Sequence, residues 1–192
     1  MSEIIDQLRI EHTNLARIVN ALERQLKVFD AGGAPDYELV QAVVEYALAY
    51  PDRYHHPKED LIEDRMREKD PEGTAQLVNL HEEHKSLAAV TRRLAEVIRT
   101  VLGEGEMLRE VVAFAMRQFI DSHREHMRME EQMFFPAALS ALNEADWAAL
   151  DARAENAPDP IFGGLADPRF VRLIADIREW DEEDAKAGLA GG

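Results

Sequence analysis

The sequence predicts an all-α protein, an antiparallel up-down four-helix bundle followed by a short C-terminal helical appendage. Two observations lead to this fold class. First, four successive segments carry apolar residues at alternating three- and four-residue steps, the pattern of a helix that turns one face to a core. Second, short turns join these segments, and helices joined in this way pack as antiparallel neighbours that cover one another's apolar faces.

The first segment is expected to be helical through about residue 29. The sequence DAGGAPD (30–36) then interrupts the pattern, with two glycines as a stop and Asp36 as a candidate N-cap of the next helix. One polar residue, His12, lies within the apolar stripe. The members of this stripe are Ile5, Leu8, His12, Leu15, Val19, Leu22, Leu26 and Phe29.

The second segment is expected from about Asp36 to Lys69. Pro51 and Pro57 should kink or break it, because proline removes a helical hydrogen bond. Its polar members again lie on the apolar face. That face carries Val44, Leu48, His55, Glu59, Ile62 and Met66.

The third segment is expected to begin in KDPEG (69–73), with Asp70 as N-cap and Pro71 at the first helical position. Its stripe consists of Leu77, Leu80, His84, Leu87, Leu94 and Ile98. The fourth segment follows the glycine-containing break GEGE (103–106). Its stripe consists of Val112, Met116, Phe119, His123, His126, Glu130, Met133 and Ala137.

The remaining fifty or so residues are predicted to form an appendage. Asn143 with Asp146 is typical of a capping box at the start of a short helix. Asp167 and Pro168 predict the start of another, with Phe170, Leu173, Ile174 and Ile177 facing inward. The end of the chain is charged, rich in glycine and has almost nothing to bury, which predicts disorder. The expected parts are the bundle at 1–142, the helical appendage packed on it at 143–182, and a disordered tail at 183–192.

The charge and composition of the chain exclude several functions. Among its 192 residues, 22 Lys and Arg stand against 38 Asp and Glu, a formal net charge of −16. Nucleic acid and membrane surfaces are therefore not expected partners, because both are anionic. A run of about 18 apolar residues and a secretory signal are both missing, which predicts a cytoplasmic protein. Without cysteine, a metal would have only nitrogen and oxygen donors, which leaves iron, manganese and zinc.

Polar residues on the four apolar stripes are the candidate metal ligands. Two of them are carboxylates, and an unpaired carboxylate buried in a bundle core costs several kcal/mol. The nearby arginines, Arg53, Arg124 and Arg128, fall off the stripes by the helix count, so a metal cation is the expected counter-charge. The polar stripe residues are His12, His55, Glu59, His84, His123, His126 and Glu130.

The spacing of these residues predicts a pair of metal ions. His55 and Glu59 lie about 40° apart around a helix, so both can approach one ion, and His126 with Glu130 repeats this spacing. The sequence around His12, IEHTNLARIVNALE, resembles that around His84, EEHKSLAAVTRRLA. One histidine and one His-x-x-x-Glu per half indicate a pseudo-twofold pair of helix hairpins. Each glutamate would then offer one oxygen to each ion.

Four motifs in this order resemble those of the hemerythrin-like HHE cation-binding family. They are His12, YHHPKEDLI (54–62), EEHKSL (82–87) and HMRMEEQMFFP (126–136), and the resemblance covers about residues 1–142. It implies a non-haem di-iron centre of two iron ions (Fe²⁺/Fe³⁺), with or without an oxo or hydroxo bridge, for which zinc or manganese could substitute. The ligands that the resemblance implies are His12, His55, Glu59, His84, His126 and Glu130.

Three further histidines stand beside this set. Glu59 projects between the directions of His55 and His56, so His56 is either another ligand or a residue outside the site. His81 and His123 each lie one turn from a better candidate. They either bind metal directly or orient a ligand through a hydrogen bond, and they rank below the others.

The resemblance implies binding of dioxygen, sensing of oxygen or redox state, iron handling, or a response to nitrosative stress. The first expectation is a protein that binds or senses dioxygen or a related small oxidant, peroxide or nitric oxide, rather than a dedicated enzyme. Three alternatives remain: a di-iron redox enzyme that consumes peroxide or nitric oxide, an iron storage or delivery protein, and a bundle whose cluster binds zinc or nothing. A sensor would need a partner protein, which is expected at the 143–180 appendage. No oligomeric state is predicted.

Overall fold

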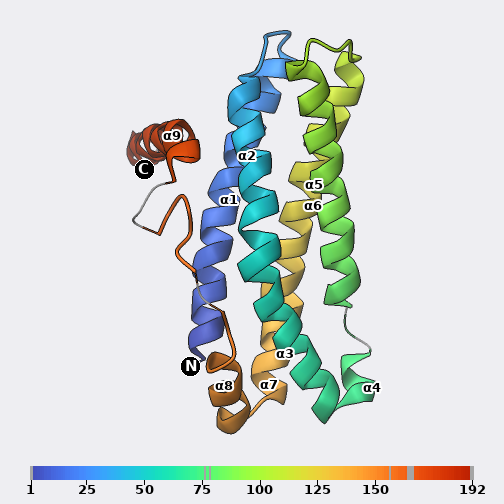
Figure 1. Ribbon diagram of the computed structural model, residues 1–192. Coiled ribbons are helices and arrows are strands. Elements are labelled where there is room, and N and C mark those ends of the chain that lie inside the picture. The colour runs from blue at the N-terminus through green and yellow to red at the C-terminus, as the bar shows by residue number, and fades with distance from the viewer. Residues whose placement is uncertain (1, 76, 78, 156, 164–166, 191–192) are drawn as a thin grey trace.

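The computed structural model describes residues 2–75, 77, 79–155, 157–163 and 167–190, and every regular element in these ranges is helical. Four long helical segments run side by side (Figure 1). Helix α1 contacts α2 and α6, and α5 contacts the same two helices, so the four close into a bundle. The all-helical prediction is thereby confirmed. The bounds are α1 Glu3–Asp30, α2 Tyr37–Ala49, α5 Leu80–Leu102 and α6 Arg109–Met129.

Two π-helices lengthen the second and fourth segments beyond α2 and α6. The interruption expected at Pro51 and Pro57 takes the form of η1 (Pro51–His55), which α3 (His56–Lys69) follows. The wide turn is closed where the His56 N–H donates to the Pro51 carbonyl, five residues back. In the fourth segment η2 (Glu130–Phe134) separates α6 from α7 (Phe135–Ala141). Turns of this kind occur frequently at functional sites.

The π-helix η2 corrects one part of the predicted stripe. Met133 was expected to face the core, but its side chain is 51% exposed. Phe134 and Ala138 are buried in place of Met133 and Ala137. A π-helical turn takes up one more residue than an α-helical turn, so every inward position after Glu130 moves one residue along the chain.

The start of the third segment also differs from the prediction. Asp70 caps a helix as expected, since its side chain accepts a hydrogen bond from the Gly73 N–H, but that helix, α4 (Pro71–Thr74), lasts a single turn. The long helix α5 begins only at Leu80, where the Asn79 side chain accepts from the Glu82 N–H. Leu77 therefore lies between helices and not on the third stripe. The second N-cap explains the restart.

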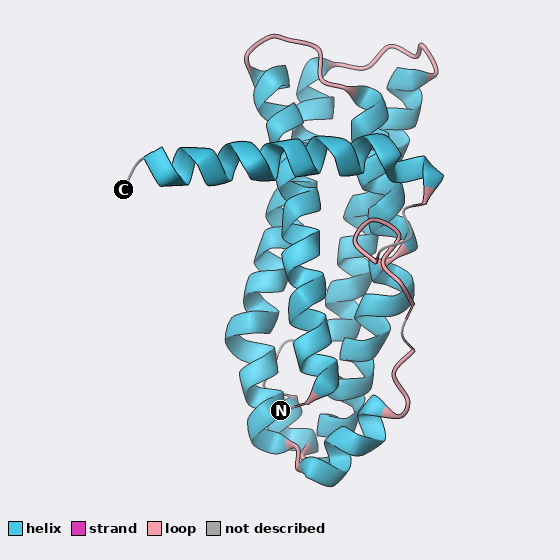
Figure 2. Cartoon of the chain, turned by 90° about the vertical axis from the view of Figure 1, so that its left-hand side faces the viewer, coloured by secondary structure: helices cyan, strands magenta, loops and turns pink. Residues whose placement is uncertain are grey.

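The appendage consists of α8 (Glu144–Asp151), the 3₁₀ turn η3 (Pro168–Phe170) and α9 (Val171–Ala190). The predicted capping box of Asn143 and Asp146 is present. Helix α9 lies across the bundle (Figure 2) and contacts α1 and α2. Helix α9 extends through Ala190, and residues 191–192 lie outside the described part. The disorder expected for residues 183–192 stays a prediction.

The apolar core falls into two clusters. The larger cluster includes Leu22, Val43, Leu94 and Phe119, and the smaller one includes Ile5, Leu8, Ile62 and Phe135. On α1, His12 lies between Leu8 of the smaller cluster and Leu15 of the larger. The polar stripe residues other than His123 therefore form a layer between two apolar clusters. Within the described residues, no helix combines the length and apolar composition needed to span a membrane.

Replacing Leu22 by alanine tests how much the larger cluster stabilises the bundle. Leu22 is fully buried in α1, so the cavity should lower the free energy of unfolding by about 2–5 kcal/mol. Ile10→Ala, on the same helix but 57% exposed, is the matched control and should change it by about 0.5 kcal/mol or less. Urea denaturation with EDTA present measures both; equal effects would contradict the assignment of this core.

Candidate metal centre

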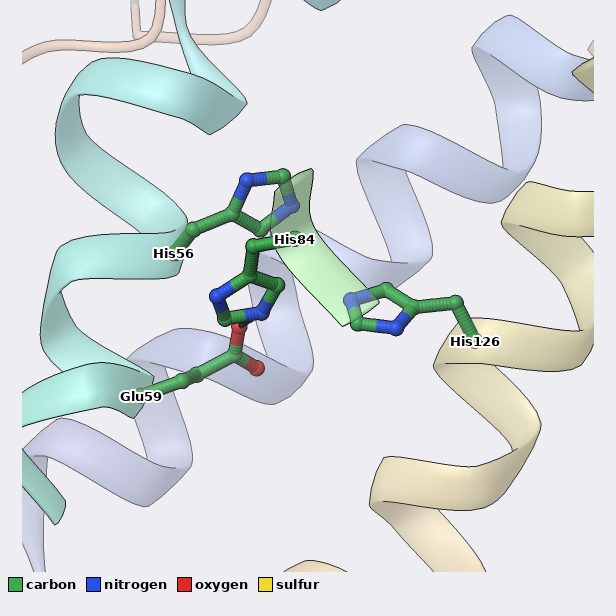
Figure 3. Close-up of side chains that lie close together, drawn as sticks. All are labelled: His56, Glu59, His84 and His126. Carbon is green, nitrogen blue, oxygen red and sulfur yellow. Dashed lines mark ion pairs between the residues drawn. The ribbon is translucent and has the colours of Figure 1, made fainter. Parts of the chain in front are cut away.

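Seven buried polar side chains meet between the two apolar clusters. Figure 3 shows part of this arrangement, in which His56 and Glu59 approach from one helix, His126 from the opposite side and His84 between them. Every long segment of the bundle contributes at least one residue. The seven, here called the polar layer, are His12 of α1, His55 of η1, His56 and Glu59 of α3, His84 of α5, His126 of α6 and Glu130 of η2.

The polar layer contains two groups of potential ligands that share Glu59. Within each group, one nitrogen or oxygen atom per residue lies within 4.8 Å of the corresponding atoms of the others. All members of both groups are buried. The first group is His12, His55, Glu59 and Glu130, and the second is His56, Glu59, His84 and His126. The structure therefore places His56, whose role the sequence left open, inside the layer.

The two carboxylates of the layer each face both groups. Glu59 directs Oε1 toward His12 and His55, at 3.6 and 3.4 Å from their Nε2 atoms, and Oε2 toward His84 Nε2 at 3.4 Å. Glu130 directs Oε2 toward His12 Nε2 at 3.2 Å and Oε1 toward His126 Nε2 at 3.0 Å. The two oxygens of each carboxylate thus point at different sets of imidazoles. Such an orientation is what a carboxylate that bridges two ions requires.

The atoms that face the middle of the layer have no hydrogen-bond partner in the described part of the chain. They are both oxygens of Glu59 and Glu130 and the Nε2 atoms of His12, His84 and His126. Leaving this many buried polar atoms unpaired would cost several kcal/mol. Two ligand atoms about 2.1 Å from one ion lie about 3.0 Å apart at a right angle and about 3.4 Å apart at a tetrahedral angle. Four of the six distances between imidazole Nε2 atoms and oxygens of the two glutamates lie between 3.0 and 3.4 Å, and the other two are 3.6 Å, so these residues fit a metal.

Charges within the layer shift the pKa values of its members strongly. Burial alone would lower the pKa of His12 and His84, but the carboxylates of Glu59 and Glu130, joined by Asp60 beside His84, raise both to about 11. Burial would raise the pKa of Glu59, yet the facing imidazoles lower it to about 2. The pKa of Glu130 is lowered in the same way. Without metal, the layer therefore holds carboxylates against protonated imidazoles.

His56 differs from these imidazoles. Burial, together with the neighbouring rings of His84 and His55, holds its pKa well below the ordinary value. The His56 and His84 rings are stacked with centroids 4.2 Å apart. His56 is thus kept neutral, which is the protonation state of a histidine that binds metal.

The outer nitrogens of four histidines contact carboxylates that sequence reasoning missed. Such contacts fix the orientation of a metal-binding imidazole and raise its basicity. Each missed carboxylate is a direct neighbour of a predicted ligand or lies four residues before one, so the helix count could have found it. The pairs are His12 with Glu131 (2.9 Å), His55 with Glu11 (2.8 Å), His56 with Asp52 (3.2 Å) and His84 with Asp60 (2.8 Å).

Glu11 is the most enclosed of these outer carboxylates. Besides His55, it accepts hydrogen bonds from the Lys58 Nζ at 2.5 Å and the Tyr50 hydroxyl at 3.2 Å. Although burial raises its pKa, the bonds from His55 and Lys58 prevail and hold the pKa at about 2. Glu11 therefore stays charged and anchors His55 firmly to α1.

His81 and His123, the two lower-ranked candidates, lie outside the layer. His81 is half exposed and contacts Asp60 at 3.3 Å and Asp64 at 3.2 Å. With Asp60 and Glu63 it forms a third cluster of potential ligand atoms. The His123 ring is buried, donates from Nδ1 to the Phe119 carbonyl at 2.9 Å and stacks on the Phe119 ring. Burial lowers the pKa of His123 to about 4.

The metal-free protein should be most stable near pH 6.5, the ordinary pKa of histidine. His12 and His84 have raised pKa values, so their contribution is complete below pH 6.5 and is lost as the pH rises toward about 11. His56 and His123 have lowered pKa values, so both destabilise the fold as the pH falls below 6.5. The loss from His123 is complete at about pH 4. Urea midpoints of EDTA-treated protein across this range measure both slopes. His12→Gln should flatten the alkaline slope, and a slope unchanged by it would contradict the assignment.

Asp60→Asn tests the contact that orients His84. The change should weaken binding of a divalent metal such as Zn²⁺ by about 10–100-fold, because the imidazole loses its charged partner. Asp64→Asn is the matched control, since Asp64 contacts only the outlying His81 among the histidines of the described residues. Competition with a chromophoric chelator gives both affinities, and equal weakening would show that Asp60 acts only through general charge.

Comparisons with known proteins agree with this geometry. A family model described as hemerythrin HHE cation binding domain matches residues 3–138, which include every member of the polar layer. Comparisons with curated proteins and with solved structures gave no match. The matched residues span well over half of the chain, and its clusters of histidine and glutamate could hold metal ions. The chain belongs to the hemerythrin HHE cation binding domain family.

Proposed function

We propose that the polar layer holds two iron ions and that the protein binds or senses dioxygen or a related small oxidant there, such as peroxide or nitric oxide. One observation carries this proposal: Glu59 and Glu130 each turn one oxygen to one set of imidazoles and the other oxygen to the second set. A single ion would leave half of these oxygens without a partner. Nitrogen and oxygen donors, without thiolates, suit iron.

The proposed ligands divide unequally between the two positions. His12 and His55 would bind one ion, and His56, His84 and His126 would bind the other. Each glutamate would contribute one oxygen to the first ion and its second oxygen to the other ion. Iron commonly takes about six ligands, so both positions would keep room for water or a small oxidant. The proposal takes the bundle as antiparallel and up-down, which the short connections 31–36 and 103–108 support.

Two iron ions would supply redox electrons and open coordination positions for a small oxidant. The residues around the ions would control access to them and would hold their ligands in place. The ring of Phe135 stacks on His12 at 5.3 Å, and the two apolar clusters cover the layer from both ends of the bundle. The outer carboxylates hold the imidazoles in place. This enclosure favours reversible binding or slow turnover over the rapid exchange of large substrates.

Iron handling is a second candidate function. The net charge of −16 attracts cations to the surface. Open coordination positions would also allow an ion to leave. Transfer of Fe²⁺ to a metal-free acceptor protein would favour this function, whereas catalytic consumption of peroxide or nitric oxide would identify a redox enzyme.

Metal content tests the proposed ligands. Wild-type protein loaded anaerobically with Fe²⁺ should retain two ions per chain. His12→Gln should lose the ion beside His55, and His84→Gln should lose the ion beside His56 and His126. Each variant should keep about one ion, because the imidazoles around the other position are unchanged. His81→Gln and His123→Gln are controls outside the layer and should retain two ions. Iron analysis after gel filtration, with circular dichroism to verify folding, measures this; one ion in wild type would refute the paired site.

The optical spectrum after admission of air tests the binding of oxidant in the same samples. A coloured state that forms with dioxygen and is reversed by its removal or by dithionite would support binding. Immediate and irreversible oxidation of all the iron would argue against it.

A further inference from the structure

An open groove lies between α5 and α6 and ends at the polar layer. Its volume is about 450 Å³. Exposed acidic residues and two serines line it, and His126 is buried at its inner end. The residues that matter here are Glu83 and Ser86 of α5 and Asp121, Ser122, Glu125 and His126 of α6. The groove therefore joins an acidic surface to a residue of the layer.

His126 is the histidine of the layer that has no outer carboxylate in the described part of the chain. It is 5% exposed and lines the groove, yet neither of its ring nitrogens has a hydrogen-bond partner among the described residues. The other four imidazoles of the layer each contact an outer carboxylate through Nδ1. His126 Nδ1, on the groove-lining residue, therefore has no carboxylate that fixes it, and only the Nε2 side of the ring faces a carboxylate of the layer. Its Nε2 already lies 3.0 Å from Glu130 Oε1.

We propose that this groove is the route by which divalent cations enter the polar layer. Glu83 and Asp121 draw the hydrated cation into the groove, and Ser86 and Ser122 replace part of its water shell. His126 is the first buried ligand that the cation meets, and it passes the cation to Glu130. This inference rests on the proposed function, because it requires that the layer hold metal.

The charge of the groove selects for cations. Glu125 is paired with Arg128 at 2.9 Å, and Arg124, which lies near Asp121, is held by Glu23 at 2.8 Å. Glu83 and Asp121 are therefore the lining carboxylates that attract a cation to the groove. A second hollow, near Pro57, also approaches the layer, but basic residues offset its acidic ones. Its charged lining consists of Arg53, Lys58 and Arg153 with Asp60, Asp64 and Glu155. A cation is thus attracted to the groove between α5 and α6 and gains little at the second hollow.

The rate of metal uptake tests the route. Metal-free full-length protein is mixed with Co²⁺ in a stopped-flow instrument, and the visible absorption of bound Co²⁺ follows uptake without oxidation. The groove variant is Glu83→Gln with Asp121→Asn. Its control is Glu106→Gln with Glu110→Gln, which makes the same change in net charge. Glu110 lies about 24 Å from His126 along α6, beyond the screening length at physiological salt.

The groove variant should take up Co²⁺ roughly five- to tenfold more slowly than wild type, with a weaker dependence on salt, while the control stays within about twofold. Ser86→Leu, which narrows the groove without changing its charge, should also slow uptake. All variants should still bind two ions at equilibrium. If the groove variant is no slower than the control, the route is wrong although two bound ions leave the proposed function intact. If wild type binds no Co²⁺, both fail.

Discussion

The burial of two carboxylates in the middle of the bundle is the constraint on which the rest of the structure depends. Glu59 and Glu130 are fully enclosed, and their four oxygens have no hydrogen-bond partner in the described residues. A buried charge of this kind is tolerated only beside a compensating charge. Protonated His12 and His84 provide it without metal, and metal ions would provide it more completely. The imidazoles and their outer carboxylates are arranged around this requirement.

Two kinds of residue surround the layer, and each has its own role. The apolar clusters above and below it supply the stability of the bundle, while the outer carboxylates hold the imidazoles in orientation. Glu11 combines both, because it joins His55 of η1 to Lys58 of α3 and to Tyr50. The first and second segments of the bundle are thereby tied together at one buried carboxylate. The side of the layer near His126 lacks such an anchor and borders the groove between α5 and α6.

Much of the fold and the core of the site could be predicted from the sequence, because both depend on helical periodicity. The stripes through His12, His84 and Glu130 placed these residues on facing surfaces, and the structure brings them together. Periodicity failed where the helical turn itself changes: Met133 lies outside because η2 contains an additional residue. The apolar pattern predicts neither the single-turn helix at Pro71 nor the extension of α9 to Ala190. The first depends on local capping, and the second depends on continuation of a helix beyond its apolar residues.

The two π-helices have a consequence for how the chain can vary. Each divides a long segment into two lengths of α-helix whose inward faces differ by about one residue, or 100°. His55 ends η1 and Glu130 begins η2, so both divisions fall at the polar layer. In these two segments, the apolar residues of one cluster therefore follow a helical pattern that is shifted by one residue relative to the pattern of the other cluster. The two ends of the bundle can exchange their apolar side chains independently while the residues between them keep their directions.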